Sequence, residues 1–277
     1  RDPEMSRGLG DVYKRQFVKS AGAIGIFVFN FLERALIPFG LHHLLYSPFY
    51  YDNVVVPGGL YAYWAKLLPQ IAASTASLKS FCPEAGFTAS GFAKMFGCLG
   101  AALAFYSTAK PEKKKKVFAL LLPITLTAIV CGVTEPIEFT FLFVAPMLFV
   151  VHAFLAATLA TTMWLAGIVG INSGGLIEIA SLNLIPLMRN HWQQYLLELV
   201  IGLIFTAIWF VVFRFLILKF DFKTPGREDE AEIEFGSKEK FRNKQAEKGG
   251  KAGDPKLELC ELILEGLGGK DNIVDVT

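Results

Sequence analysis

Two carboxylates stand where the chain is about to become strongly hydrophobic. They are Glu135 and Glu138 in "GVTEPIEFTFLFVAP", residues 132–146, on either side of Pro136. An ionisable residue inside a bilayer costs about 2.5–3.5 kcal/mol on insertion scales. Proline cannot continue a helix, and irregular backbone at membrane depth is tolerated where it lines a cavity. The break at Thr134–Pro136 therefore predicts an interrupted element whose carboxylates face a polar site.

The hydrophobic run after this motif indicates the class of the protein. No Asp, Glu, Lys or Arg occurs in the 39 residues from Phe139 to Ile177, whereas one spanning helix needs roughly 20 residues. Hydrophobic residues make up 53% of the chain and charged residues 19%, below the roughly 25% charged residues of soluble domains. We therefore predict an all-α integral membrane protein in contact with lipid, which disfavours a soluble enzyme. The net charge of +2 gives no reason to expect a nucleic-acid partner.

Other ionisable residues also fall near the expected membrane depth. They are Arg34, His42, His43 and Lys94. Carboxylates accept hydrogen bonds, arginine and lysine donate them, and histidine can do both, so such a lining suits the many hydroxyls of a sugar. Tyr46, Phe49 or Tyr50 would stack on the apolar face of the ring. The sequence thus predicts one sugar-binding cavity.

Several of these residues have a second interpretation. Glu138 could be the solvated start of a helix at the membrane surface, and Lys94 could extend to a lipid headgroup. His43 could be a structural histidine, and His152 and His191 are expected to be packing residues. The four cysteines show no metal-ligand spacing, and we expect neither a metal nor a cofactor.

The elements that must position these residues are helices of membrane length. The candidate spans are residues 117–133, 139–166 and 195–220. Residues 87–109 are rich in small side chains, which let membrane helices approach closely. Positive residues favour the cytoplasm, which places both 110–116 and the lysines after residue 218 inside. An even number of crossings must separate them, so either the glycine-broken stretch 167–187 also crosses or one segment is a re-entrant hairpin.

Four regions differ in composition along the chain. We expect a non-native extension in residues 1–16, the C-terminal part of a membrane domain in 17–222, a charged flexible linker in 223–255, and the truncated start of a small soluble α/β domain in 256–277. The last region has a helical stripe of apolar residues, a Gly-Gly stop and then strand-like alternation.

Five segments resemble one family, the membrane subunit (enzyme IIC) of the glucose superfamily of the bacterial phosphoenolpyruvate-dependent sugar phosphotransferase system. The opening motif resembles the family signature "GITEPIEF-FLFVAP". "ERALIPFGLHHLLYSPF" and "MFGCLGAALAFYSTAKPEKKKKV" resemble two further segments, the second departing from the family at Cys98-Leu99. "KFDFKTPGRE" is similar to the end of the membrane domain in the maltose and α-glucoside branch, and "ILEGLGGKDNIVDVT" to the start of a fused enzyme IIB domain.

The resemblance implies roles for individual residues. Glu135 corresponds to a sugar-binding glutamate in a re-entrant hairpin that contacts the hydroxyl to be phosphorylated, and it is the expected catalytic residue. His42 corresponds to a substrate-binding histidine and Arg34 to a cavity arginine, while Lys94 falls near a basic position. The full set of expected substrate-binding residues is Arg34, His42, His43, Lys94, Thr134, Glu135 and Glu138.

The resemblance also implies an activity and its partners. We expect a multi-pass permease of the bacterial cell membrane that imports a sugar, with maltose or another α-glucoside favoured, and couples import to phosphorylation. Enzyme IIB and IIA components, homodimer formation and a cytoplasmic C-terminal tail are part of this expectation. The family's phosphate-carrying cysteine follows the equivalent of Asp275-Val276-Thr277, so Cys260 is not that residue.

Two other functions fit the residues alone. One is a secondary, proton-coupled sugar transporter without phosphoryl transfer, in which the glutamates would carry protons. The other is a regulatory or structural membrane protein with a degenerate site, which a sugar-binding titration would separate from both transporters.

Overall fold

The computed structural model describes residues 22–227, and no strand occurs within this part of the chain. The expected extension in residues 1–16 and the α/β domain start in 256–277 lie outside the described residues, as does nearly all of the expected linker. An all-helical fold agrees with the class predicted from composition.

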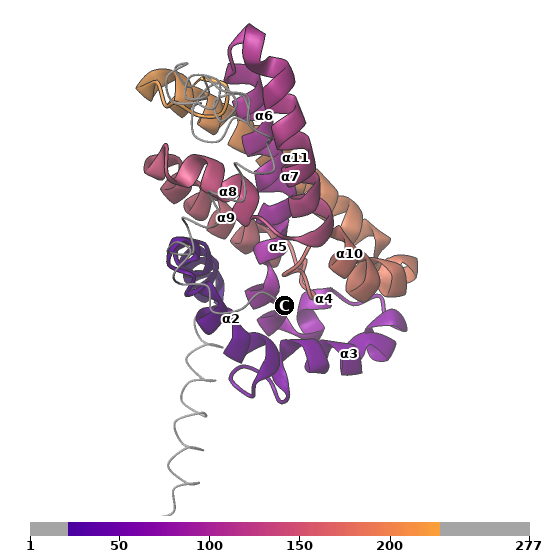
Figure 1. Cartoon of the computed structure of the whole chain (residues 1–277). Helices are drawn as coiled ribbons and strands as arrows, with labels where there is room; N and C mark the ends of the chain where they lie inside the picture. The colour runs from indigo at the N-terminus through magenta and orange to yellow at the C-terminus, as the bar shows by residue number, and fades with distance from the viewer. Residues whose placement is uncertain (1–21, 228–277) are drawn as a thin grey trace, which may run out of the picture. The chain divides into compact units, whose positions relative to one another are not determined.

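The first half of the described chain consists of short helices followed by one long helical stretch. A helix covers residues 22–35. After it come η1 (Ile37–Phe39), α2 (His42–Tyr51), α3 (Gly59–Ala72), α4 (Leu78–Phe81) and η2 (Pro83–Thr88). The chain then continues without a break through α5 (Ser90–Phe92), the π-helix η3 (Ala93–Gly97) and α6 (Cys98–Thr108). Figure 1 shows α2 and α3 together at one end of this arrangement.

The second half contains the longer helices. In chain order this half comprises η4 (Pro111–Lys113), α7 (Lys114–Cys131), α8 (Glu135–Leu142), α9 (Pro146–Leu165), α10 (Leu176–Ile179), the π-helix η5 (Ala180–Leu184) and α11 (Ile185–Phe220), of which α7, α9 and α11 are the longest. The long helix α11 packs against α6, α9 and α3. It therefore contacts helices from both halves of the described chain (Figure 1).

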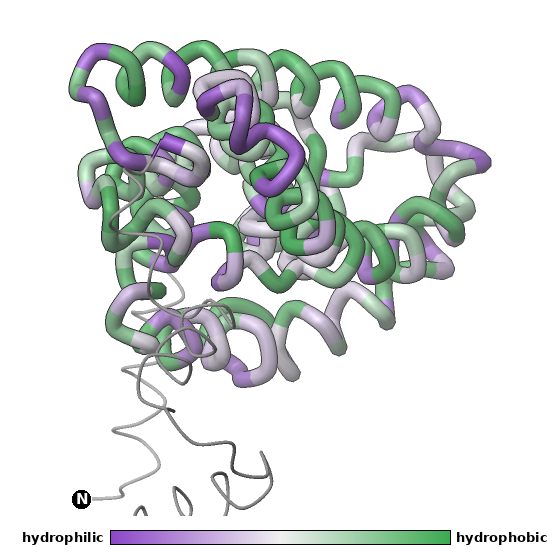
Figure 2. The backbone as a smooth tube through the Cα atoms, turned by 45° about the horizontal axis from the view of Figure 1, so that its top comes forward, coloured by the Kyte–Doolittle hydropathy of each residue, from purple (hydrophilic) through white to green (hydrophobic). Residues whose placement is uncertain are grey.

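Three helical stretches within residues 22–227 are long and apolar enough to cross a membrane. They are Pro83–Thr108, Pro146–Leu165 and Leu176–Phe220. Hydrophobic residues run along most of the helices, and many hydrophilic ones gather at helix ends and connections (Figure 2). The expectation of several candidate spans is thus met in the described part of the chain.

The boundaries of the expected spans differ in an informative way. Residues 139–166 form parts of two helices, because the backbone of Ala145 is non-helical and Pro146 starts α9. Of residues 117–133, all up to Cys131 lie in α7, which starts with three lysines and is not among the candidate spans. Pro83–Thr108 is a candidate span instead, and it covers most of residues 87–109, which are rich in small side chains.

Small residues let α6 and α11 approach closely. A Cβ atom on Gly100 would lie 2.6 Å from the backbone oxygen of Thr206, and one on Gly202 would lie 2.3 Å from the ring of Phe96. The hydroxyl of Thr206 also donates to the backbone oxygen of Phe96 at 3.0 Å. Such contacts are typical of helix pairs in membranes, where close packing replaces the hydrophobic driving force.

Replacing Gly100 by alanine should therefore lower the free energy of unfolding. The new methyl group would push α6 away from α11, and overpacking of this kind costs about 1–3 kcal/mol. Unfolding in mixed detergent–SDS micelles, followed by tryptophan fluorescence, measures the effect. Leu103→Ala on the exposed face of α6 is the control, and equal stability of the Gly100→Ala and wild-type proteins would contradict the close contact.

A second pair of glycines joins α7 to the loop before α10. Gly132 ends α7 in the left-handed region with φ +77°, and its amide donates to the backbone oxygen of Ala128 at 3.1 Å. A Cβ atom on Gly132 would lie 2.5 Å from the nitrogen of Gly175, and one on Gly175 would lie 2.5 Å from the oxygen of Val130. This contact fixes the turn that leads into α8.

Candidate functional site

The start of α8 presents the carboxylates of the opening motif. Thr134 precedes the helix, and Pro136 lies in its first turn, where a missing amide proton does no harm. The backbone oxygen of Thr134 accepts hydrogen bonds from the amides of Ile137 at 3.1 Å and Glu138 at 2.9 Å. The proline break therefore begins a new helix, with Glu135 as its first residue.

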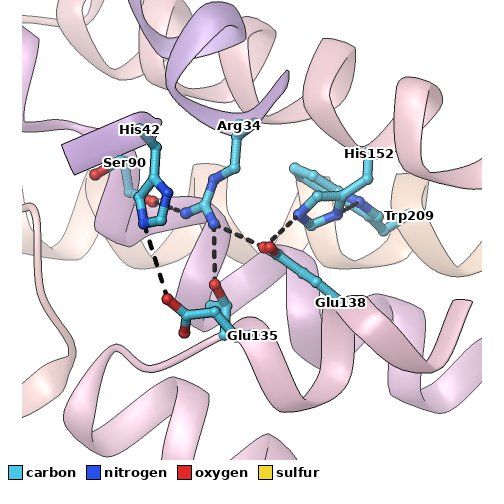
Figure 3. A network of polar contacts seen from close by, with 8 residues as sticks. Arg34, His42, Ser90, Glu135, Glu138, His152 and Trp209 are labelled. Carbon is cyan, nitrogen blue, oxygen red and sulfur yellow. Dashed lines mark hydrogen bonds and ion pairs between the residues drawn. The ribbon is translucent and has the colours of Figure 1, made fainter. Parts of the chain in front are cut away.

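Glu135 faces an imidazole from the other half of the chain. Its Oε1 lies 3.9 Å from Nε2 of His42, the first residue of α2 (Figure 3). The Glu135 side chain is 39% exposed and that of His42 is 12% exposed. The ring of His43 lies 4.0 Å from that of His42, centre to centre, and its Nδ1 contacts the hydroxyl of Tyr46 at 2.5 Å. The structure thus places a partly exposed acceptor opposite a partly exposed imidazole, which can both contact a small polar ligand.

Arg34 is buried, and protein groups occupy both of its terminal nitrogens. Nη1 donates to Oε1 of Glu138 at 2.7 Å and to the hydroxyl of Thr134 at 3.2 Å. Nη2 donates to the backbone oxygen of Ser90 at 2.8 Å (Figure 3). The guanidinium therefore joins the helix of residues 22–35 to α5 and to the start of α8.

Glu138 is fully buried, so the interpretation as a solvated helix start is wrong. Besides Arg34, its Oε1 lies 3.3 Å from Nε2 of His152 on α9. Nδ1 of His152 in turn accepts a hydrogen bond from Nε1 of Trp209 on α11 at 3.1 Å. Sequence reasoning placed His152 among packing residues, and it is buried among rings, but it also contacts this carboxylate.

Lys94 lines a polar cavity beside the α7–α8 turn. The cavity has a volume of about 220 Å³, smaller than the roughly 300–1,000 Å³ of ligand pockets. Its lining comprises Glu33, Tyr46, Tyr50, Tyr51, Tyr61, Lys94, Cys131, Gly132, Ser173, Gly174 and Glu178. Charged groups of both signs, hydroxyls and aromatic rings together suit a small hydroxylated ligand. Glu135 and His42 are not among the lining residues, but Lys94 lies close enough to interact electrostatically with both.

Glu33, Tyr61, Ser173 and Glu178 are polar residues of this cavity that sequence reasoning missed as candidates. Among residues 22–227, Oε2 of Glu33 is buried without a hydrogen-bond partner. Tyr61 donates to Oε2 of Glu178 at 2.7 Å, and its hydroxyl also contacts Ser173 at 2.6 Å. Glu33 and Glu178 carried a detectable signal, because both are acids beside apolar runs. Tyr61 and Ser173 carried none.

The comparisons with known proteins identify the family. Residues 5–157, more than half of the chain, match the family described as "Phosphotransferase system, EIIC". The chain belongs to this family. The family resemblance drawn from the five segments is therefore confirmed. The match begins at residue 5, inside the extension expected in residues 1–16.

Curated relatives of this EIIC chain carry sugar-specific names. It is 50% identical over 278 residues to the "PTS system maltose-specific EIICB component" of Bacillus subtilis (strain 168), covering 99% of this chain and 52% of the relative. It is 52% identical over 280 residues to the "PTS system alpha-glucoside-specific EIICB component" of Leptotrichia buccalis, covering 99% and 53%. The "Phosphotransferase IIC component GlvC" of Escherichia coli (strain K12) is 49% identical over 176 residues, covering 64% and 47%. The EIIC chain spans about half the length of the curated relatives it matches.

Proposed function

We propose that this EIIC chain is the membrane part of a phosphotransferase permease that imports maltose or another α-glucoside. Relatives that share about half of its residues are named for these sugars. The observation that carries the proposal is the partly exposed Glu135 opposite His42, at the start of a new helix in a chain with membrane-length helices. A carboxylate in this position can orient a sugar hydroxyl and take its proton.

The proposed reaction is phosphoryl transfer to the bound sugar. The hydroxyl oxygen attacks the phosphorus of a cysteinyl phosphate on an EIIB domain, the S–P bond breaks and an O–P bond forms. Glu135 accepts the hydroxyl proton, and the cysteine leaves as thiolate. The added charge then prevents the product from returning through the bilayer.

We propose that α8 belongs to a re-entrant hairpin. Its eight residues extend only about 12 Å at 1.5 Å per residue, whereas the hydrocarbon core is about 30 Å thick. Such a segment enters the membrane without crossing it and leaves its start facing a cavity. The lysines at 110–116 and 219–223 support a cytoplasmic position for both of those regions, and hence for the C-terminal tail.

The other expected site residues are assigned by their surroundings. Lys94 is proposed to bind sugar hydroxyls in the polar cavity together with Glu33. His43 is proposed to contact sugar beside His42. Arg34, Thr134 and Glu138 contact one another, and we propose that they support the sugar-facing turn in this conformation. Homodimer formation and pairing with EIIB and EIIA components remain part of the proposal.

Expression of the complete gene in cells without their own maltose uptake should restore accumulation of maltose as a phosphate ester. Uptake of radiolabelled maltose and chromatography of the cell extract measure this directly. The reaction should require phosphoenolpyruvate in membrane vesicles supplied with the soluble phosphotransferase proteins. Accumulation of unmodified maltose that a protonophore abolishes would instead favour a proton-coupled transporter, which the comparisons do not support.

A further inference from the structure

We propose that His152 and Trp209 are positioning residues for the sugar site, which they reach through Glu138 and Arg34. The inference rests on the proposed function for its effect on sugar, but the geometric part stands without it. Neither residue belongs to α8 or to the helix of residues 22–35. The side chain of His152 nevertheless lies 3.3 Å from Glu138 at the start of α8, and Trp209 donates to His152 from behind it (Figure 3).

The first link assigns the protons of His152. The indole N–H of Trp209 can only donate, so Nδ1 of His152 must be the acceptor in their 3.1 Å contact. In a neutral ring the proton is then on Nε2, by inference from the hydrogen-bond network. That nitrogen lies 3.3 Å from Oε1 of Glu138. Trp209 therefore turns the Nε2 side of the imidazole toward the carboxylate, in a close polar contact that does not reach hydrogen-bond geometry within the described residues.

The second link is the guanidinium of Arg34. Oε1 of Glu138 lies between Nε2 of His152 and Nη1 of Arg34, at 3.3 and 2.7 Å. The same Nη1 donates to the hydroxyl of Thr134, the residue before Glu135. Rotation of the Glu138 carboxylate would therefore shift the guanidinium of Arg34 and break the hydrogen bond from Arg34 to Thr134.

The surroundings make this chain of contacts sensitive to each member. His152, Glu138 and Trp209 are fully buried, and the rings of Phe141 and Phe213 lie 5.8 and 6.4 Å from the imidazole. Water cannot replace a lost partner in such a setting, and hydrogen bonds strengthen in a low dielectric. Oε2 of Glu138 has no hydrogen-bond partner within the described residues, so His152 and Arg34 are the groups that limit its rotation.

The pair of variants His152→Gln and His152→Met separates positioning from packing. Both side chains are unbranched and similar in length, but only glutamine can donate an N–H from the place of Nε2 to Glu138. Two readouts apply to the complete protein in detergent micelles: hydrogen exchange of the amides of Ile137 and Glu138, and maltose affinity by titration calorimetry. Methionine should speed this exchange and weaken maltose binding by about tenfold, because it removes the polar contact to the buried carboxylate of Glu138. Glutamine should keep both within about threefold of wild type, a difference of well under 1 kcal/mol.

The same substitutions at His191 provide the control. His191 is another buried imidazole, and its Nε2 contacts the backbone oxygen of Ile71 at 3.0 Å. His191→Met should leave the exchange of Ile137 and Glu138 unchanged. Equal behaviour of the Gln and Met variants at 152, or equally fast exchange in His191→Met, would overturn the proposal.

Trp209→Phe provides a second test if His152→Met does not fold. It keeps an aromatic ring but removes the N–H that sets the imidazole, and it should speed exchange at the start of α8 as His152→Met does. Unchanged exchange in this variant would also overturn the proposal. Wild-type protein that binds no maltose would refute the proposed function, whereas the exchange results would still decide the positioning role.

Discussion

Glu135→Gln should abolish the phosphorylation of maltose by the complete protein. Glutamine keeps the size of the side chain and one acceptor oxygen, but it cannot accept the hydroxyl proton. A positioned general base contributes about 10²–10⁴-fold to a rate, and we expect a loss of this order. Phosphoenolpyruvate-dependent formation of labelled sugar phosphate in membrane vesicles measures it.

The matched control for this variant is Glu112→Gln. Glu112 is exposed in η4, far along the chain from the site residues, and its change should leave the rate near that of wild type. Binding of maltose to Glu135→Gln by titration calorimetry separates lost proton transfer from lost affinity. An unchanged phosphorylation rate in Glu135→Gln would refute the catalytic role of this carboxylate.

Arg34→Met should lower the free energy of unfolding by about 3–5 kcal/mol, the usual cost of removing one partner from a buried ion pair. The change leaves the carboxylate of Glu138 with His152 alone and removes the donors to Thr134 and to the oxygen of Ser90. SDS titration in mixed micelles, followed by tryptophan fluorescence, measures the loss.

A double variant shows whether the loss comes from the uncompensated charge. Arg34→Met combined with Glu138→Leu removes both charges, and we expect it to recover part of the stability because apolar pairs often replace buried ion pairs at little cost. Arg214→Met is the surface control. Arg214 donates to the hydroxyl of Ser107 at an exposed position, and its loss should change stability by less than about 0.5 kcal/mol. Wild-type stability in Arg34→Met would contradict the importance of the buried pair.

Part of the site was predictable because its cause is local. The proline at 136 and the apolar run after it required a helix break and a new helix start, and α8 does begin at Glu135. Composition alone indicated a helical membrane protein. The break before α9 also has a local cause in Pro146. The continuous apolar run does not reveal this break, because apolar residues occur in helical and in non-helical backbone alike.

The rest depends on contacts between distant residues. Glu135 and Glu138 are three positions apart, and nothing in their spacing shows that one is partly exposed while the other is buried. That difference arises from Arg34, 104 residues earlier in the chain, and from His152 on α9. The cavity beside the turn likewise depends on Tyr61 and Ser173, 112 residues apart, and neither residue is unusual in its local sequence.

The backbone contact between Gly132 and Gly175 restricts how the site can move. The two backbone segments lie so close together that a Cβ atom on either glycine would overlap the other segment. We therefore expect the turn before Glu135 to move together with the loop that carries Ser173 and with the start of α10, which carries Glu178. A transport cycle that relocates the sugar would therefore move Glu135 together with the cavity residues Ser173 and Glu178. A methyl group added at Gly175 would separate the two segments and uncouple their motion.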